Sequence, residues 1–157
     1  MTVYRVTHKK YKASTLAGVG AEKVGGRWNK KGTRAVYCSE NASLALLEYY
    51  VHSENIAYLP KNVLTAEITF PDDLAIEEIN NLPQEWSRYP YSSKTSAIFS
   101  DFARDRNAFA LRVPSTIVEV ESNIILNPLY KDFGKVEVVD FIELPIDPRL
   151  RKGKREE

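Results

Sequence analysis

The sequence predicts an α+β fold in a single domain. Short runs rich in β-branched and aromatic residues outnumber runs with helical periodicity, and long helices do not alternate with them as a doubly wound fold requires. The length of 157 residues suits one domain with a continuous core. We therefore expect mixed or antiparallel sheets with a few short helices over residues 1–150, and a charged tail at 151–157 that frays.

Strands and one helix are expected in the first half of the chain. Residues 2–6 alternate β-branched or aromatic side chains with polar ones, which predicts a half-buried strand. Ser39 and Asn41 follow a short apolar run, and either side chain can cap a helix. The expected elements are a strand at 2–6, one helical turn at 13–17, a loop up to residue 26, a strand at 35–38 and a helix at 41–53.

The predicted helix at 41–53 carries a carboxylate beside its apolar side. Leu44, Leu47 and Val51 fall on one stripe at helical spacing, and Glu48 falls on the same stripe. Because an unpaired buried charge is destabilising, such a residue reaches solvent, pairs with a cation or lines a cleft. A boundary residue that reaches water and a member of a functional site both remain open.

The second half predicts further short strands around one helix. Pro83 and Pro90 flank tyrosines and Trp86, which indicates a loop packed by its aromatic side chains. Ile98 and Phe102 lie four residues apart in the predicted helix. The expected elements are a strand at 63–70, a short helix or irregular segment at 74–82, a helix from 93 or 95 to 104, and strands at 108–113, 116–120, 123–126 and 136–142.

Composition excludes several classes of function. With 43% hydrophobic and 27% charged residues the chain is an ordinary globular protein, and a net charge of +1 disfavours nucleic-acid binding through overall charge. The single cysteine, Cys38, cannot form an internal disulfide and lies in an apolar run, so we expect it to pack in the core. There is neither a signal-peptide pattern nor an apolar run of about 20 residues. We therefore expect a soluble cytoplasmic protein without membrane association.

The stretch from Gly25 to Asn29 combines features of a turn and of an anion site. Its two glycines permit a sharp turn or a close approach of the backbone. Arg27 has five donors in a fixed geometry that suits phosphate or carboxylate. Trp28 adds a flat apolar face, and we expect it to anchor the loop by packing. Both interpretations stay open on these residues alone. Positive charge nearby comes from Lys30, Lys31 and Arg34.

Metal and covalent chemistry find little support in the sequence. His8 and His52 are far apart and have no ligand spacing with Cys38, so we expect no metal site. Ser115 follows a proline at a strand end, but no Gly-x-Ser-x-Gly elbow surrounds it, and a turn-initiating serine is the ordinary explanation. The segment 18–20 has neither the third glycine of a dinucleotide fingerprint nor the lysine of a P-loop.

Four polar or aromatic residues remain, and together they suit a ligand with phosphate, a heterocycle and sugar hydroxyls. Arg27 can neutralise a diphosphate and Tyr37 can stack on a heterocycle. Ser115 can hydrogen-bond an amide or a ribose. Glu48 can stabilise an oxocarbenium-like centre while an N-glycosidic bond breaks.

Several motifs, in order along the chain, resemble those of the RES domain family. Arg27, Glu48 and Ser115 match the arginine, glutamate and serine for which this family is named. The motifs are Gly26-Arg27-Trp28-Asn29 with Gly32, Val36-Tyr37-Cys38-Ser39, Ala45-Leu46-Leu47-Glu48, Leu111-Arg112-Val113-Pro114-Ser115, Glu121-Ser122-Asn123 and Leu126-Asn127-Pro128, with Tyr4-Arg5 and Asp147-Pro148-Arg149-Leu150 at the edges. Departures occur at Asp101-Phe102, where the family usually has tryptophan after the aspartate, and at Leu129-Tyr130, where histidine is common after Asn-Pro.

The resemblance implies an ADP-ribosyltransferase-like fold and the toxin of a bacterial toxin–antitoxin pair that degrades NAD+ at the nicotinamide N-glycosidic bond. It implies catalytic roles for Glu48, Arg27 and Ser115, and NAD+ binding by Arg27, Tyr37, Ser115 and Asn29. NAD+ is then a substrate, and no cofactor or metal is expected. The implied partners are an Xre-type helix-turn-helix antitoxin and a second copy of the chain. Water, phosphate or a protein side chain remain open as acceptors of the ADP-ribosyl group.

Two other classes of function remain open. The basic loop with Trp28, Lys30, Lys31 and Arg34 can serve an RNA-binding or RNA-cleaving protein by contacting phosphates and stacking on bases. A partner-binding domain without catalysis is the third possibility, and saturation with NAD+ would leave its melting temperature unchanged.

Overall fold

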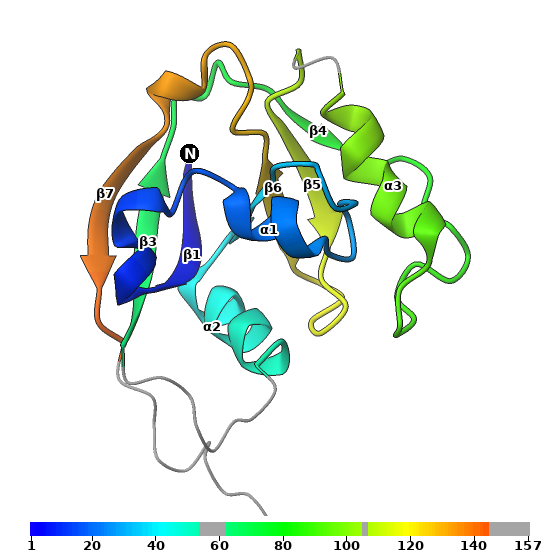
Figure 1. Ribbon diagram of the computed structural model, residues 1–157, viewed down its shortest axis with the longest axis horizontal. Helices are drawn as coiled ribbons and strands as arrows, with labels where there is room; N and C mark the ends of the chain where they lie inside the picture. The colour runs from blue at the N-terminus through cyan, green and yellow to red at the C-terminus, as the bar shows by residue number, and fades with distance from the viewer. Residues whose placement is uncertain (54–61, 105–106, 145–157) are drawn as a thin grey trace, which may run out of the picture.

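A seven-stranded sheet forms the centre of the molecule, and short helices lie around it (Figure 1). The computed structural model describes residues 1–53, 62–104 and 107–144. The strands are β1 (Thr2–His8), β2 (Val36–Ser39), β3 (Val63–Thr69), β4 (Ile76–Glu78), β5 (Ala110–Pro114), β6 (Ser122–Leu126) and β7 (Glu137–Ile142). The helices are α1 (Val19–Val24), α2 (Ala42–Val51) and α3 (Ser93–Phe102), with 3-10 turns at Lys9–Ser14 and Phe133–Lys135.

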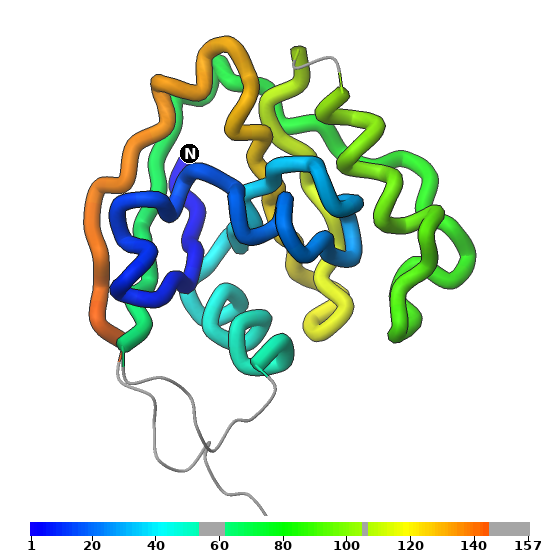
Figure 2. The backbone as a smooth tube through the Cα atoms, viewed as in Figure 1, coloured from blue at the N-terminus to red at the C-terminus, as the bar shows by residue number. Residues whose placement is uncertain are grey.

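The sheet is mixed, which confirms the predicted α+β class. Its strand order is β4-β5-β6-β2-β1-β3-β7, and β4 and β5 run parallel whereas the other neighbours are antiparallel. The N-terminal strand lies inside the sheet, between β2 and β3 (Figure 2). The motif at residues 147–150 and the predicted tail lie outside the described residues.

Two apolar clusters occupy the two faces of the sheet. Successive residues of a strand point to opposite faces, and neighbours along β6 accordingly divide between the clusters. Ile124 joins Val36 and Cys38 in one cluster, whereas Ile125 joins the other. Phe99 of α3 and Trp28, both buried, pack in this second cluster, so the predicted packing role of Trp28 is confirmed.

β1 and β2 share fewer paired residues than any other two neighbouring strands of the sheet. Tyr4 and Ser39 form the one pair recorded there, whereas β1 and β3 pair along their whole length. The two strands therefore diverge after this pair. Helix α2 contacts β1, β2 and β3 and so covers the junction. The figures show the turn that follows β5, in yellow, beside α2, in cyan (Figures 1 and 2).

The helical turn predicted at 13–17 lies earlier in the chain, as the 3-10 turn Lys9–Ser14. Three further predicted elements differ from the structure. Residues 19–24 form α1 instead of a loop, bounded by Gly18 and Gly25, both at positive φ. Residues 116–120 form a turn instead of a strand, because the Ser115 hydroxyl accepts hydrogen bonds from the backbone N–H groups of Ile117 and Val118. Residues 76–78 form the edge strand β4, which pairs with the distant β5.

The predicted apolar stripe of α2 is also only partly correct. Leu44 is buried, but Leu47 and Val51 are 37% and 59% exposed, and Ala45 completes the buried side. The helix begins where Asn41 caps it by accepting a hydrogen bond from the backbone N–H of Leu44, at 2.8 Å. The buried side of α2 therefore includes Leu44 and Ala45 instead of Leu47 and Val51, and Glu48 lies at its boundary.

No helix in the described ranges is long and apolar enough to cross a bilayer.

Candidate active site

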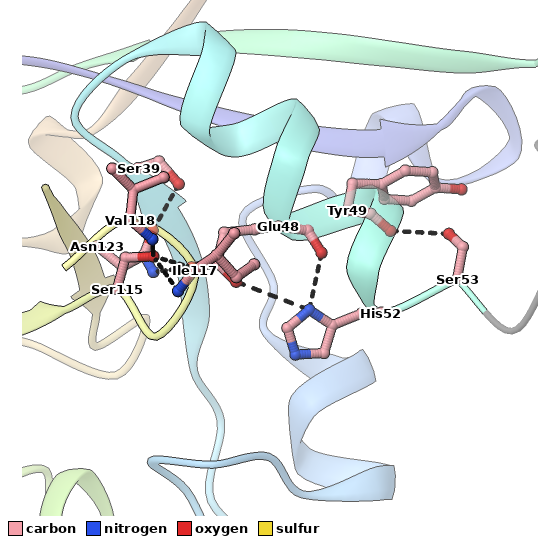
Figure 3. A network of polar contacts seen from close by, with 9 residues as sticks. All are labelled: Ser39, Glu48, Tyr49, His52, Ser53, Ser115, Ile117, Val118 and Asn123. Carbon is pink, nitrogen blue, oxygen red and sulfur yellow. Dashed lines mark hydrogen bonds and ion pairs between the residues drawn. The ribbon is translucent and has the colours of Figure 1, made fainter. Parts of the chain in front are cut away.

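Side chains from two distant segments hold Glu48 in place (Figure 3), and Glu48 lines a cleft. Its Oε1 accepts a hydrogen bond from Ser115 Oγ at 2.9 Å and another from Asn123 Nδ2 at 2.6 Å. The side chain is 19% exposed, so it still reaches the cleft. Two donors on one oxygen fix the orientation of the carboxylate and leave Oε2 without a hydrogen bond within the described residues.

Ser115 is fully buried and supports Glu48 from behind. Its hydroxyl accepts hydrogen bonds from the backbone N–H groups of Ile117 and Val118 at 3.0 and 3.1 Å, so its own proton points to Glu48. The cleft is lined by its neighbours Pro114 and Thr116. The predicted contact of Ser115 with a substrate remains a prediction, and its position suits a residue that acts through Glu48.

Asn123 has a positioning role that sequence reasoning missed. Ser39 Oγ donates a hydrogen bond to Asn123 Oδ1 at 2.6 Å, which turns the amide so that Nδ2 faces Glu48. Asn123 and Glu48 lie 75 residues apart in the sequence, so local periodicity carries no signal for the pair. Pairing of β2 with β6 at Ser39 and Asn123 brings the three side chains together.

His52 also lines the cleft, one helical turn after Glu48. Its Nδ1 lies 2.7 Å from the backbone oxygen of Glu48 and 3.7 Å from Oε2. A proton on Nδ1 makes that first contact a hydrogen bond and leaves Nε2 as an acceptor. From the sequence, His52 was expected only not to bind a metal, although its spacing of four residues from Glu48 places the two side chains next to each other on a helix. In the described part of the chain, no three His, Cys, Asp or Glu side chains gather as a metal site requires.

The cleft itself has a volume of about 550 Å³ and opens beside the junction of β1 and β2. Arg27, Tyr37 and Glu48 line it, as does Arg5, which stood out in the sequence only as part of the Tyr4-Arg5 motif. Further lining comes from α1, from the glycine pair before Arg27 and from the exposed side chains of Tyr89 and Tyr91. The cleft therefore combines one carboxylate with two guanidinium groups and several aromatic rings.

Arg27 contacts the loop at residues 86–91 on the rim of the cleft. Its Nη1 donates hydrogen bonds to the backbone oxygens of Trp86 and Arg88 at 2.6 and 2.8 Å. The guanidinium carbon lies 5.9 Å from the centre of the Tyr91 ring. Burial lowers the pKa of Arg27, and the charge of Glu48 opposes this shift. Arg27 thus faces the same space as Glu48 without forming an ion pair with it.

Tyr37 and Asn29 form a buried unit behind Arg27. The Tyr37 hydroxyl donates a hydrogen bond to Asn29 Oδ1 at 2.7 Å and accepts one from the backbone N–H of Trp28 at 3.3 Å. Burial raises the pKa of Tyr37 above its usual range, so the hydroxyl keeps its proton. A Cβ on Gly26 would lie 2.8 Å from the Tyr37 oxygen, which explains the glycine there.

Asn29 is fully buried and does not line the cleft. Its Nδ2 donates hydrogen bonds to the backbone oxygens of Ala21, Lys30 and Thr33 at 2.9, 3.1 and 3.1 Å. These bonds tie the loop before β2 to α1. The predicted contact of Asn29 with a substrate remains a prediction, and its bonds suit a structural support for Tyr37.

Cys38 packs in the core, as predicted, and burial raises the pKa of its thiol to about 12. The thiolate form needed for nucleophilic attack is therefore scarce at neutral pH.

We expect Ser115→Ala to lower the stability of the protein and to leave the Glu48 carboxylate less firmly oriented. The change removes the donor to Glu48 and leaves the half-buried backbone N–H groups of Ile117 and Val118 without their acceptor, so the free energy of unfolding should fall by about 2 kcal/mol. For a domain of this size the melting temperature should fall by about 4–8 °C, which calorimetry measures. Ser93→Ala, at the start of α3, is the matched control and should stay within about 2 °C.

The amino-acid sequence matches a known protein family over the segments that form this site. The model of the RES domain family matches residues 2–147. The chain belongs to the RES domain family. The match covers every residue of the network around Glu48 and both arginines of the cleft.

Relatives of this RES domain extend over nearly the whole chain. "Toxin Res" of Photorhabdus laumondii subsp. laumondii is 39% identical over 157 residues, which cover 99% of this chain and all of the relative. "Toxin Res" of Yersinia enterocolitica is 34% identical over 152 residues, covering 96% of this chain and all of the relative. "Prs ADP-ribosylating toxin" of a Sphingobium species is 36% identical over 144 residues, covering 89% of each chain.

Proposed function

We propose that this RES-family protein is a bacterial toxin that breaks the N-glycosidic bond between nicotinamide and ribose in NAD+. The observation that carries the proposal is the Glu48 carboxylate, oriented by Ser115 and Asn123 at the wall of a cleft that also contains two arginines. The names of the relatives support it, since two are called "Toxin Res" and another "Prs ADP-ribosylating toxin".

The carboxylate is suited to stabilise the positive charge that develops as the bond breaks. The electron pair of the carbon–nitrogen bond leaves with nicotinamide, which departs as a neutral molecule, and C1′ of the ribose becomes oxocarbenium-like. A preoriented carboxylate favours this charge without reorganisation at the moment of reaction. Glu48 Oε2, which has no hydrogen bond within the described residues, is the oxygen available for this role.

The cleft also suits the remainder of the substrate. A volume of about 550 Å³ lies within the range of roughly 300–1,000 Å³ typical of small-molecule sites. Guanidinium groups in the wall favour the diphosphate, and tyrosine rings on the rim offer surfaces for a heterocycle. Tyr37 lines the cleft, and its hydroxyl is already bound to Asn29, so its ring is the part of the side chain left for a substrate.

The acceptor of the ADP-ribosyl group remains one of three. Water, phosphate or a protein side chain forms the new bond to C1′ and releases a proton. His52 lines the cleft beside Glu48 and is a candidate to receive that proton. A bound metal or cofactor is not part of the proposal, because nicotinamide is already a good leaving group. A homodimer, an Xre-type antitoxin and a cytoplasmic location complete the proposal, and the names of two relatives as toxins support the antitoxin.

The RNA-directed alternative finds less support in the geometry of the basic loop. Trp28 is 3% exposed and stacks on Trp86, with ring centres 5.9 Å apart, so its face is not available to a base. Arg34 pairs with Glu22 at 3.1 Å. An RNA affinity that falls steeply with salt would favour this alternative.

Product identification tests the proposal. Purified protein is incubated with NAD+ in three mixtures, one with buffer only, one with phosphate and one with bacterial extract. We expect nicotinamide in at least one mixture, together with ADP-ribose, its 1-phosphate or an ADP-ribosylated protein, which mass spectrometry distinguishes. Absence of nicotinamide from all three mixtures would contradict the enzymatic claim.

A further inference from the structure

Glu121 is not among the described residues that line the cleft, but its side chain and its backbone are both firmly bound. Its Oε2 accepts a hydrogen bond from Asn41 Nδ2 at 3.0 Å, across 80 positions of the sequence. Its backbone oxygen accepts a hydrogen bond from the N–H of Ser115 at 3.0 Å, and its own N–H donates to the oxygen of Val118 at 2.9 Å. Glu121 therefore joins the start of α2 to the turn that carries Ser115.

Asn41 uses both atoms of its side-chain amide at the start of α2. Oδ1 caps the helix by accepting a hydrogen bond from the backbone N–H of Leu44 at 2.8 Å, while Nδ2 donates to Glu121. Within the described helix α2, the first turn has no acidic residue of its own. The carboxylate of Glu121 therefore supplies, from a distant segment, the negative charge that the N-terminus of a helix favours.

These contacts close a ring that includes the carboxylate of Glu48. Ser115 donates a hydrogen bond to Glu48, which lies seven positions after Asn41 and so about 10 Å further along the helix. The turn at residues 115–121 thus binds α2 at two points, at its start through Glu121 and further along through Ser115 (Figure 3). Two such points fix the helix along its axis and in rotation, whereas one point would let it pivot.

The apolar packing of α2 lies on a different set of elements. The helix packs on β1, β2 and β3, whereas Ser115 and Glu121 belong to the turn between β5 and β6. Apolar packing is not directional, but hydrogen bonds weaken steeply when their geometry departs from the preferred one. The polar ring is therefore the part of the structure that sets the placement of Glu48 relative to Ser115 and Asn123.

We propose that Glu121 is a positioning residue for the reaction. Through Asn41 it sets where α2 stands, and it thereby directs the Glu48 oxygen that Ser115 and Asn123 leave free. Glu121 touches no substrate and acts only through this ring. The inference rests on the proposed function for the reaction that Glu48 promotes.

A reversal of donor and acceptor tests this role. Asn41→Asp keeps the helix cap, because aspartate caps as well as asparagine, but it places a second carboxylate against Glu121. In the double variant Asn41→Asp/Glu121→Gln, the amide at 121 can donate to the carboxylate at 41, which restores the hydrogen bond with its polarity reversed. The ion pair of Arg112 with Glu40, at 2.5 Å, holds the residue before the cap and should keep the variants folded.

The kinetics of nicotinamide release from NAD+ give the first readout. Asn41→Asp should lower kcat by about 10-fold, a loss within the range that a small misplacement of a catalytic group causes. KM should stay within about threefold, because Arg27 and Tyr37 line the cleft from segments outside the ring. The double variant should return kcat to within about threefold of wild type.

The matched control is Asn41→Asp/Glu119→Gln. Glu119 is an exposed carboxylate of the same turn. Its removal lowers the negative charge of the turn by the same amount but offers no donor to the carboxylate at 41. This variant should therefore keep the low kcat of Asn41→Asp.

Amide hydrogen exchange gives a second readout, which needs no turnover. The backbone N–H groups of Ile117 and Val118 are bound to Ser115 Oγ, outside α2. In Asn41→Asp they should exchange faster by about fivefold, and in the Glu121→Gln double variant they should return to the wild-type rate. A cap that acts only within α2 would leave their exchange unchanged.

Equal kcat and equal exchange in wild type and Asn41→Asp would overturn the positioning role. A loss that Glu121→Gln does not restore, or that Glu119→Gln restores equally, would overturn it as well. If Asn41→Asp does not fold, Asn41→Ser replaces it, because serine keeps the cap but has no donor that is placed like Nδ2. Wild-type kcat and exchange in Asn41→Ser would then overturn the proposal.

The two proposals can fail separately. A protein whose amide exchange follows the expected pattern but which releases no nicotinamide would contradict the proposed function alone. Nicotinamide release with the same kcat in wild type and Asn41→Asp would contradict this inference alone.

Discussion

Glu48→Gln is expected to lower the rate of nicotinamide release from NAD+ by about 10²- to 10³-fold, the usual effect of removing one preorganised electrostatic group. The substitution keeps the shape of the side chain, and its amide oxygen can still accept the hydrogen bonds from Ser115 and Asn123. The melting temperature should therefore change by less than about 3 °C. A loss of rate with an intact fold isolates the negative charge as the catalytic element.

The control for this experiment is Glu137→Gln, because Glu137 is an exposed carboxylate on β7, outside the cleft. Its rate should equal that of wild type. With an active wild type, a Glu48→Gln rate comparable to the control would reject the role assigned to Glu48.

Asn29→Asp is expected to cause the largest loss of stability. The change is isosteric, but it places a carboxylate oxygen against the three backbone oxygens that Asn29 Nδ2 now bonds. Since this side chain is fully buried, we expect the free energy of unfolding to fall by about 4 kcal/mol, the size of other uncompensated buried charges. The melting temperature should drop by about 8–16 °C, as measured by circular dichroism.

The loss should also depend on pH. Burial raises the folded-state pKa of the introduced carboxyl above its unfolded value of about 3.9. The deficit is then largest at neutral pH and shrinks as the pH falls through the folded-state pKa. Asn80→Asp, at an exposed position, is the control and should show neither effect. A melting temperature at pH 7 within about 2 °C of wild type would contradict the structural role of Asn29.

Local sequence patterns predicted the fold class and most of the elements, because strands such as β1 and helices such as α2 have short-range signals. The cap at Asn41 marked the start of α2 correctly. The turn after Ser115 was missed because a hydroxyl competes with the ladder for backbone N–H groups, although residues 116–120 have a β-like composition. Helix α1 was missed because the glycines at both of its ends suggested a loop.

The residues of the candidate site could likewise be predicted only in part, because contacts between distant segments leave no local pattern in the sequence. Arg27, Tyr37 and Glu48, proposed from residue chemistry and family resemblance, do line one cleft. The hydrogen bond from Asn123 to Glu48 depends on the pairing of β2 with β6, which residue spacing does not reveal. Arg5 stood out in the sequence only as part of the Tyr4-Arg5 motif, and only the divergence of β1 from β2 brings it to the cleft.

The central claim is that the Glu48 cleft breaks the nicotinamide bond of NAD+. A time course of free nicotinamide, followed by proton NMR with wild type and Glu48→Gln in parallel, tests it most directly. We predict more than one nicotinamide released per wild-type molecule with a suitable acceptor present, and almost none from the variant. No release by wild type with water, phosphate or bacterial extract as the source of acceptor, or equal release by both proteins, would contradict the claim.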